Sequence, residues 1–289
     1  MSEVNNKTEK RQYVYGHECP SITADIIAMG VRKLPAVDWR HCARLQMMIL
    51  LVHRRSNSKA YPGYWALPGG FFRTKDKNIE ACARRELKEE TNLVAENLIP
   101  IGNFSEKGRD PRGWYVTFPY LAIVDMHDMP RINIKASDDV DDAEWFAVTQ
   151  ESDKDGVTIT LDADSGVKFV MRVHCRRGEG LVQPDIKVDY EVGRLAFDHG
   201  EIIATALHGI SGPGRRLRAC AFLGDGFTMA EMRYVYDFMA SNSSREGTIA
   251  QTFRRRMNKF VKDGIIEATG ELSEGRGYHP AALYRWVAV

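Results

Sequence analysis

The apolar positions of the N-terminal half fall into short runs that predict strands on both sides of one amphipathic helix. Strands are expected at residues 21–31, 45–53, 98–104, 114–124 and 142–148. The helix is expected between the second and third strands, because apolar residues recur there at helical spacing. These residues are Ile79, Cys82, Ala83 and Leu87. This order of elements predicts an α/β sandwich.

The pattern in residues 150–193 is different, because apolar and polar residues alternate around Asp164, Ser165 and Gly166. Alternation on both sides of a Gly-containing turn predicts a hairpin, which is either an insertion or an extra pair of strands. Residues 194–210 follow, with Asp198 as a predicted helix N-cap and Glu201 at the capping-box position. We interpret His199 as a structural or interface residue rather than a metal ligand, because no second ligand has metal spacing to it.

The C-terminal pattern predicts two helices and a hairpin. Residues 227–240 have Thr228 as N-cap and Glu231 at the capping-box position. A polar turn leads to a second helix, 248–263, whose predicted buried stripe is Ile249, Phe253, Met257, Phe260 and Val261. Residues 265–269 and 282–287 can pair as two strands and form a wing. Helix, turn, basic helix and wing in this order predict a winged helix-turn-helix.

Length and composition fit a two-domain globular protein. The chain has 289 residues, with 44% hydrophobic and 27% charged residues, and has no apolar run long enough for a membrane span. Residues 1–20 are predicted to be a flexible arm and lack the apolar core of a signal peptide, so we expect a cytoplasmic location. The five cysteines are scattered without CxxC spacing and are expected to be reduced thiols.

Charge is distributed unevenly along the chain. Residues 213–289 contain twelve Lys or Arg against eight Asp or Glu, a net of +4, whereas the whole chain carries +1. The remainder is therefore near −3, and the two parts are expected to be different modules.

Three carboxylates, Glu86, Glu89 and Glu90, share one face of the predicted helix. They repel one another unless a cation or a nearby Arg offsets their charge, and Mg²⁺ is the cation that such oxygens prefer. A solvated acidic face is the alternative interpretation. We expect no tightly bound cofactor beyond this possible Mg²⁺ site.

Residues 69–93 resemble the Nudix box, whose pattern is G, five residues, E, seven residues, REUxEExGU, with U an aliphatic residue. The second half matches at Arg85, Glu86, Leu87, Glu89, Glu90 and Leu93. Gly70 lies one residue too far upstream, so the loop has gained a residue and Lys77 or Asp76 stands at the first Glu. Asn92 replaces the later Gly and tolerates a positive φ. The resemblance implies a Nudix fold, with no residue assigned as catalytic and the three glutamates as residual candidates.

Two clusters of basic residues are candidate binding sites. Arg109 and Arg112 flank Pro111 on a predicted loop and suit phosphate or carboxylate, although surface arginines on an ordinary turn are an equal alternative. The second predicted C-terminal helix is the other cluster, where a solvated basic face is the alternative to DNA binding. The candidate DNA contacts there and in the wing are Thr252, Arg254, Arg255, Asn258, Lys259 and Arg276.

The chain as a whole resembles the NrtR-type Nudix-related transcriptional regulators of bacterial NAD metabolism. The segments that carry this resemblance are SITADII, YWALPGGFF, RELKEETNL, GRDPRG, DAEWFAV, LAFDHGEII and residues 227–286. It implies a Nudix α/β/α sandwich at 21–193, with 150–193 as the extra segment, and a winged helix-turn-helix at 194–289 that includes its connecting helix. It further implies a homodimer that binds operator DNA and is regulated, most simply as a repressor, by ADP-ribose or a related metabolite.

The resemblance also implies which residues contact the effector. The candidate ligand-binding residues are Gly69, Gly70, Arg85, Arg109 and Arg112, beside the acidic helix. The alternative function is a Mg²⁺-dependent ADP-ribose pyrophosphatase, in which the three glutamates bind the metal. Weaker alternatives are a winged module that binds protein or RNA, and a sugar-phosphate effector.

Overall fold

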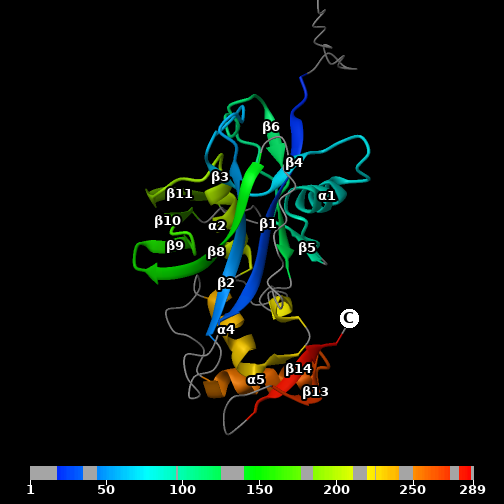
Figure 1. Cartoon of the computed structure of the whole chain (residues 1–289). Coiled ribbons are helices and arrows are strands. Elements are labelled where there is room, and N and C mark those ends of the chain that lie inside the picture. Colours follow the sequence, from blue (N-terminus) through cyan, green and yellow to red (C-terminus); the bar gives the residue numbers. More distant parts are fainter. Residues whose placement is uncertain are drawn as a thin grey trace, which may run out of the picture.

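The computed structural model describes residues 18–34, 44–95, 97–124, 140–176, 185–210, 220–224, 226–240, 250–273 and 280–287. Most of the predicted N-terminal arm lies outside these ranges, as do Ile249, Arg276 and the polar turn before the second C-terminal helix. Figure 1 shows a large sheet with helices beside it and a smaller C-terminal module at one end of its long strands.

Within the described ranges, the large sheet contains eleven strands. They are β1 (Ser21–Leu34), β2 (Arg44–Arg54), β3 (Trp65–Ala66), β4 (Gly69–Phe71), β5 (Asn97–Pro100), β6 (Tyr115–Thr117), β7 (Tyr120–Ile123), β8 (Val140–Asp153), β9 (Gly156–Ala163), β10 (Lys168–Arg176) and β11 (Asp185–Val192). The main path runs β11-β10-β9-β8-β2-β1-β7-β5, with β3 paired to β2, and β4 and β6 paired to β1. Strand β1 runs antiparallel to β2 and parallel to β7, which places it at the centre.

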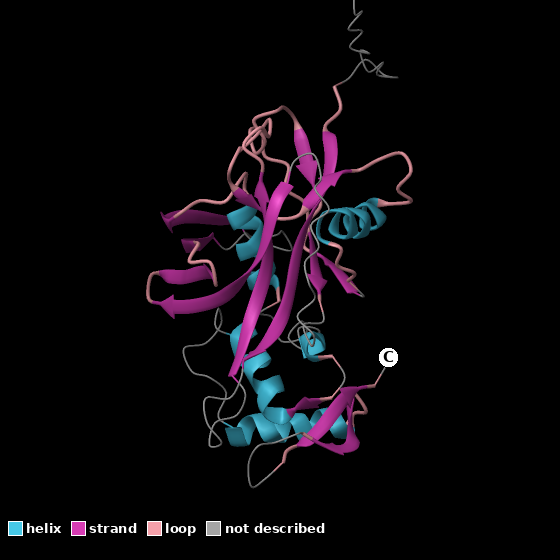
Figure 2. Ribbon diagram, viewed as in Figure 1, coloured by secondary structure: helices cyan, strands magenta, loops and turns pink. Residues whose placement is uncertain are grey.

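The central strands are buried on both faces because successive side chains point to opposite sides of the sheet. On β1, Ile26 belongs to the core on one face and Ile27 to the core on the other, and both are fully buried. Helix α1 (Ile79–Thr91) packs on the first face and α2 (His199–Gly209) on the second. Figure 2 shows these helices on either side of the strands. The predicted α/β/α sandwich is therefore confirmed.

The predicted helix α1 buries the side that its spacing indicated. Cys82, Ala83 and Leu87 are almost completely buried, and Ile79 is partly buried against the same core. Asn78 caps the helix, because its side-chain oxygen accepts a hydrogen bond from the backbone N–H of Ala81 at 2.8 Å. The helix ends at Asn92, whose φ is +61°, so Asn adopts the left-handed conformation that the Nudix pattern usually gives to Gly.

The hairpin predicted within residues 150–193 is confirmed. Strands β9 and β10 pair antiparallel across the turn at Asp164, and β8 continues to Asp153 to pair with β9. Strand β11 then pairs with β10. The segment thus extends the main sheet by three strands, and α2 packs against this extension as well as against β1 and β2.

Two strand predictions needed correction. The single strand expected at 114–124 is two strands, β6 and β7, because Phe118 and Pro119 interrupt it. Proline has no N–H for a strand ladder, and the two parts pair with different stretches of β1. The strand expected at 98–104 ends at Pro100, and beyond it only an isolated bridge joins Phe104 to Thr117.

The C-terminal module has the predicted order of a winged helix-turn-helix. Its elements are the short 3-10 helix η1 (Cys220–Leu223), β12 (Phe227–Thr228), α4 (Met229–Ala240), α5 (Ala250–Lys262), β13 (Ile266–Leu272) and β14 (Ala282–Trp286). Strands β13 and β14 pair as predicted, and β12 adds a third strand that the sequence analysis missed. The capping box is confirmed, because Glu231 N–H donates to Thr228 Oγ1 at 3.2 Å and Thr228 N–H to Glu231 Oε2 at 2.7 Å.

The buried stripe of α5 is partly as predicted. Phe253 and Met257 are buried in a core with Phe227, Met232 and Ile266, and Phe260 packs against it. Val261 is 41% exposed, so its place in the stripe was wrong. It lies four residues beyond Met257, in the last turn of α5. None of the described helices is long and apolar enough to cross a membrane.

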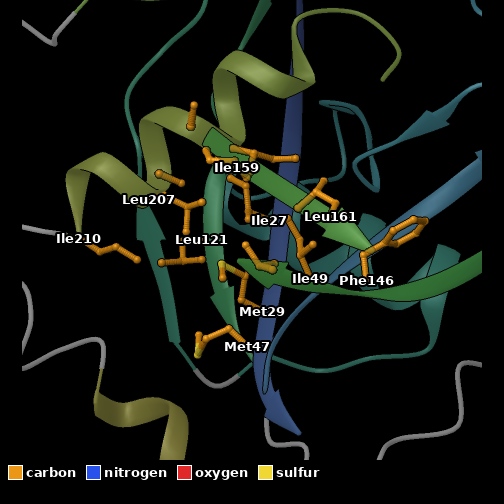
Figure 3. Packing of buried hydrophobic residues seen from close by; sticks show 14 of the residues in the cluster. Ile27, Met29, Met47, Ile49, Leu121, Phe146, Ile159, Leu161, Leu207 and Ile210 are labelled. Carbon is orange, nitrogen blue, oxygen red and sulfur yellow. The ribbon is translucent and has the colours of Figure 1, made fainter. Parts of the chain in front are cut away.

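Helix α4 joins the C-terminal module to the main sheet. Val235 and Met239 belong to the same hydrophobic core as Met47 on β2 and Val31 on β1. Figure 3 shows other members of this core, with Met47 near its lower end and Leu207 of α2 beside the strands. Lys33 Nζ also lies 3.0 Å from Glu231 Oε1. The two modules therefore share packed residues.

Candidate functional site

A cavity of about 460 Å³ opens between the start of β1, strand β4, helix α1 and the start of α2. It is the place where several of the predicted site residues meet. The lining residues are Thr23, Asp25, Arg54, Leu67, Gly69, Gly70, Phe71, Arg73, Glu86, Glu89, Glu90, Arg109, Asp110, Arg112, Phe197 and His199.

The predicted glycine pair lets the loop before α1 run directly against the acidic residues. A Cβ added to Gly70 would lie 2.5 Å from Glu86 Cδ, and one added to Gly69 would lie 2.4 Å from the carbonyl oxygen of Ala24. The Gly69 backbone N–H donates a hydrogen bond to Glu90 Oε2 at 2.9 Å. Glycine at both positions therefore brings backbone and carboxylates into direct contact on one wall of the cavity.

The three predicted carboxylates do not share one environment. Glu86 and Glu90 are 5% and 8% exposed, while Glu89 has a side chain that is 43% exposed. Burial raises the pKa of Glu90 to about 8 and also raises the pKa of Glu86. A solvated acidic face, the alternative interpretation from sequence, therefore describes Glu89 alone.

Arginines offset the charge of this cluster. Arg85 contacts Glu86 and lies 3.1 Å from Glu89 Oε2, and Arg73 lies 3.2 Å from the same oxygen. Carboxylate oxygens have the chemistry for Mg²⁺, but these three glutamates each contact a protein donor. Within the described residues, no group of three or more His, Cys, Asp or Glu is arranged to hold a metal ion. Arginine is thus the counter-charge of Glu86 and Glu89, and the Gly69 backbone N–H is the partner of Glu90.

Asp76, one of the two residues that could stand at the first Glu of the Nudix pattern, forms an ion pair with Arg85. It binds Arg85 through both carboxylate oxygens, at 2.7 Å to Nε and 2.8 Å to Nη2, and these bonds hold the pKa of Asp76 well below its usual range. Arg85 also donates to the carbonyl oxygen of Phe71. Arg85 is not among the residues that line the cavity, and it joins the loop to α1. Its role in ligand binding stays a prediction.

Arg109 enters the cavity from the predicted loop, and its side chain is only 5% exposed. Its guanidinium donates to both carboxylate oxygens of Asp198, at 2.9 and 2.6 Å, and lies 3.5 Å from Asp25 Oδ2. Burial raises the pKa of Asp25 despite this arginine. The interpretation of Arg109 as an ordinary surface residue is therefore wrong, and its partners Asp25 and Asp198 were not predicted.

Arg112 also lines the cavity, and its guanidinium is held by Asp110 at 2.6 Å. The guanidinium carbon lies 5.0 to 5.7 Å from the ring centroids of Phe71, Tyr115 and Phe197. At this distance the electrostatic attraction between a cation and an aromatic face is favourable. The wall around Arg112 therefore offers flat rings together with a guanidinium.

The segment that leads into α2 contributes residues that the sequence analysis did not place in the site. Phe197 has a φ of +53° and His199 is buried, and both line the cavity. His199 Nδ1 accepts a hydrogen bond from the Leu67 backbone N–H at 2.8 Å, and burial lowers the pKa of His199 to about 3. The prediction that His199 is structural agrees with this contact. Phe197, next to an N-cap, carried no sequence signal for a binding site.

The predicted capping box at α2 is wrong. Asp198 occupies the N-cap position, but its side chain makes no capping hydrogen bond. Its carboxylate is directed to Arg109 instead. A charged, bidentate partner outweighs a backbone N–H for the same carboxylate.

The predicted DNA-binding residues lie mostly on one exposed helix. Arg254, Arg255, Asn258 and Lys259 of α5 are exposed, on the side away from buried Phe253 and Met257. The side chain of Thr252 and all of Arg276 lie outside the described residues. Three cations and one amide thus form a basic, solvent-facing surface on α5.

Comparison with known proteins agrees with these features. Residues 40–161 match the NUDIX domain. The chain is 29% identical to the "ADPR responsive transcriptional repressor NtrR" of Acinetobacter baylyi, over 83% of this chain and 76% of that protein. A MutT/nudix family protein from Enterococcus faecalis has a similar structure, with a TM-score of 0.65 and 26% identity over 96% of this chain and 90% of that chain.

Shewanella oneidensis NrtR also has this fold. Alone it aligns with a TM-score of 0.57, and in complex with a 27mer DNA with a TM-score of 0.52, at 22% identity in both cases. The alignments cover 92% of this chain and 94% or 93% of those chains. Residues 40–161 thus match a NUDIX domain, and the chain as a whole is similar to the Acinetobacter baylyi repressor and shares the fold of Shewanella oneidensis NrtR.

Proposed function

We propose that the protein is a ligand-responsive transcriptional repressor of genes for NAD or cofactor metabolism. In this proposal, the C-terminal module binds operator DNA, and the Nudix cavity binds ADP-ribose or a related nucleoside diphosphate. The protein would act in the cytoplasm. It would act as a homodimer, because the two half-sites of an operator match the two-fold symmetry of a dimer. The name of the Acinetobacter baylyi relative, which describes it as ADPR responsive and a repressor, supports this proposal.

The exposed side chains of α5 support DNA binding. Arg254, Arg255 and Lys259 would contact phosphates, and Asn258 has the amide that can read a base edge. The hydrophobic core of Phe253 and Met257 against α4 holds this surface outward. Shewanella oneidensis NrtR, which shares the fold, has been crystallised with a 27mer DNA.

The cavity chemistry supports a nucleoside diphosphate. Arg109 and Arg112 present guanidiniums that can bind phosphate oxygens bidentately. The rings of Phe71 and Phe197 also line the cavity, lie within 5.7 Å of the Arg112 guanidinium carbon and offer surfaces for a planar base. The proposal concerns ligand binding, and hydrolysis by the acidic helix is the alternative that the experiment below separates from it.

The single observation that carries the proposal is the core shared by the two modules. Strands β1 and β2 run from the cavity, at Asp25 and Arg54, to the packing of Met47 against Val235 and Met239 of α4. Packed cores respond to strain by discrete rearrangement. A ligand that binds one arrangement of the cavity better than another would therefore change DNA affinity by the same coupling free energy.

A fluorescence titration tests this function. A labelled DNA fragment from upstream of the protein's own gene is titrated with protein over a range of salt concentrations, with and without ADP-ribose and in the presence of Mg²⁺. We expect binding that ADP-ribose weakens. The double variant Arg254→Ala and Arg255→Ala should bind less tightly, and its dependence of log K on log salt should be shallower by up to about 1.8, at about 0.9 per lost phosphate contact.

The matched control is the double variant Lys168→Ala and Lys187→Ala, which removes two exposed cations from β10 and β11. It should bind DNA like the wild type. Equal salt dependence in the Arg254 and Arg255 variant and in the wild type would exclude α5 as the DNA-binding helix. The integrity of ADP-ribose is followed in the same samples: conversion to AMP without DNA binding would contradict the repressor and favour the hydrolase.

A further inference from the structure

Asp198 lies at the start of α2 and also contacts the wall of the cavity. It is the N-cap residue of α2, and its carboxylate forms a bidentate ion pair with Arg109, a residue 89 positions away in the sequence. Its side chain is 21% exposed and that of Arg109 is 5% exposed, so solvent screens this pair only weakly. The contact joins the cavity wall directly to the N-cap residue of α2.

The sequence at this point encodes a contact that the structure does not make. Asp198 followed three residues later by Glu201 fits a capping box, in which Asp198 would accept a hydrogen bond from the N–H of Glu201. No such hydrogen bond is present, because the carboxylate is directed to Arg109. Asp198 therefore has two mutually exclusive partners, and Arg109 holds it in the structure.

A diphosphate in the cavity would compete for Arg109. Its oxygens suit the guanidinium fork as well as a carboxylate does, and a buried guanidinium cannot give both its bidentate face to Asp198 and the same face to a phosphate. The anionic ligand would also repel Asp198 and Asp25, which both lie beside Arg109.

We propose that a bound nucleoside diphosphate displaces Asp198 from Arg109. The released Asp198 carboxylate then accepts hydrogen bonds from the backbone N–H groups in the first turn of α2 and so caps the helix. This inference rests on the function proposed above and adds how its site is coupled to DNA binding. Asp198 is a positioning residue in this scheme: it acts through Arg109 and through α2, and it does not need to touch the ligand.

Helix α2 is placed to pass on such a change. Ile202, Ile203, Ala206 and Leu207 of this helix are almost fully buried in the core that also contains Val235 and Met239 of α4. Figure 3 shows Leu207 and Ile210 next to Leu121 and Ile27 of the sheet. Because this core is densely packed, a shift or a new cap at the start of α2 changes the packing available to α4.

The test uses the full-length protein and two substitutions of Asp198. Asn caps helices about as well as Asp but cannot form the ion pair, whereas Ala does neither. Calorimetry should show that both Asp198→Asn and Asp198→Ala bind ADP-ribose about tenfold more tightly than the wild type, because no carboxylate competes for Arg109. Asp153→Asn is the matched control, because it removes another bidentate pair, with Arg172, far from the cavity. It should leave ADP-ribose affinity unchanged.

Hydrogen exchange of the α2 amides distinguishes capping from simple competition. In the wild type, ADP-ribose should slow exchange in the first turn of α2. The amides of Asp198→Asn should already exchange slowly without ADP-ribose, and those of Asp198→Ala should not respond to it. Circular dichroism of each variant verifies that it is folded.

The outcomes also separate this inference from the proposed function. If the wild type binds ADP-ribose and releases DNA, but the Asp198 variants bind ADP-ribose with wild-type affinity or α2 exchange does not respond, the inference is overturned and the proposed function stands. If the wild type binds neither ADP-ribose nor DNA, the proposed function fails first.

Discussion

His199 offers a prediction whose size follows from the structure. The residue is 3% exposed, and its Nδ1 accepts a hydrogen bond from the Leu67 backbone N–H at 2.8 Å. Its Nε2 lies 3.9 Å from Asp25 Oδ1. A second proton on Nδ1 would break the bond to Leu67 in a buried site. Burial accordingly lowers the pKa of His199 to about 3, from 6.5 in an exposed histidine.

The lowered pKa makes stability depend on pH in one direction. Below pH 6.5 the unfolded chain binds a proton at His199 and the folded chain does not, so the stability that this residue contributes is lost as pH falls from 6.5 towards 3. Between pH 7 and pH 5 the loss is about 2 kcal/mol, since each pKa unit corresponds to about 1.4 kcal/mol. For a chain of this size that corresponds to about 4–8 °C in Tm.

The substitution that isolates this effect is His199→Asn. Its side-chain oxygen can accept the Leu67 hydrogen bond, but it does not titrate. We expect the variant to be less stable than the wild type at pH 7 because it fills less space, and the difference in Tm to shrink by about 4–8 °C at pH 5. Thermal unfolding followed by circular dichroism at both pH values measures this. His174→Asn, which makes the same substitution at an exposed histidine of β10, is the matched control.

The comparison also cancels the opposite contributions of Asp25 and Glu86, whose raised pKa values favour the folded chain at low pH. If Tm falls by the same amount between pH 7 and pH 5 in the wild type and in His199→Asn, His199 is not buried in its neutral form. The hydrogen bond described between His199 and Leu67 would then be wrong.

Two further predictions concern backbone positions. Thr228→Ala removes the cap of α4 and should destabilise the C-terminal module by about 0.5–2 kcal/mol in thermal unfolding, whereas Thr228→Ser should retain most of the stability; equal loss in both would contradict the capping role. Gly69→Ala forces a Cβ to 2.4 Å from the backbone carbonyl oxygen of Ala24, and should cost about 1–3 kcal/mol and weaken ADP-ribose binding, measured by calorimetry; wild-type affinity and stability would mean that the loop is not packed against β1 as described.

The sequence predicted the elements whose signal is local. Helix α1 and its buried side, the β9–β10 hairpin and the Thr228 cap all follow from residues within a few positions of one another. Spacing and capping depend on backbone geometry that repeats within one turn of a helix or one pair of strands. The Nudix pattern likewise placed the glycines, the acidic helix and the Asn92 end from contiguous residues.

Contacts across the chain were decided only by the tertiary structure. The sequence assigned Asp198 to a cap because a capping residue and its partner are neighbours in the chain, but Arg109, 89 residues away, takes its carboxylate. Leu67 and His199 are 132 residues apart, and Asp25 joins Arg109 from β1. No periodicity carries this information, because the pairing of β1 with β4 and β6 and the placement of α2 bring these residues together.

The sequence by itself thus determined that a Nudix-like sheet and acidic helix precede a basic helical module, since both are encoded in local patterns. The tertiary structure decided which charges are buried and which are paired. In the sequence, Glu86, Glu90 and Arg109 cannot be distinguished from exposed charged residues. Only the packing of the sheet, the loop and α2 removes them from water. Desolvation and the choice of partner are properties of the folded surroundings, and these give the cavity its chemistry.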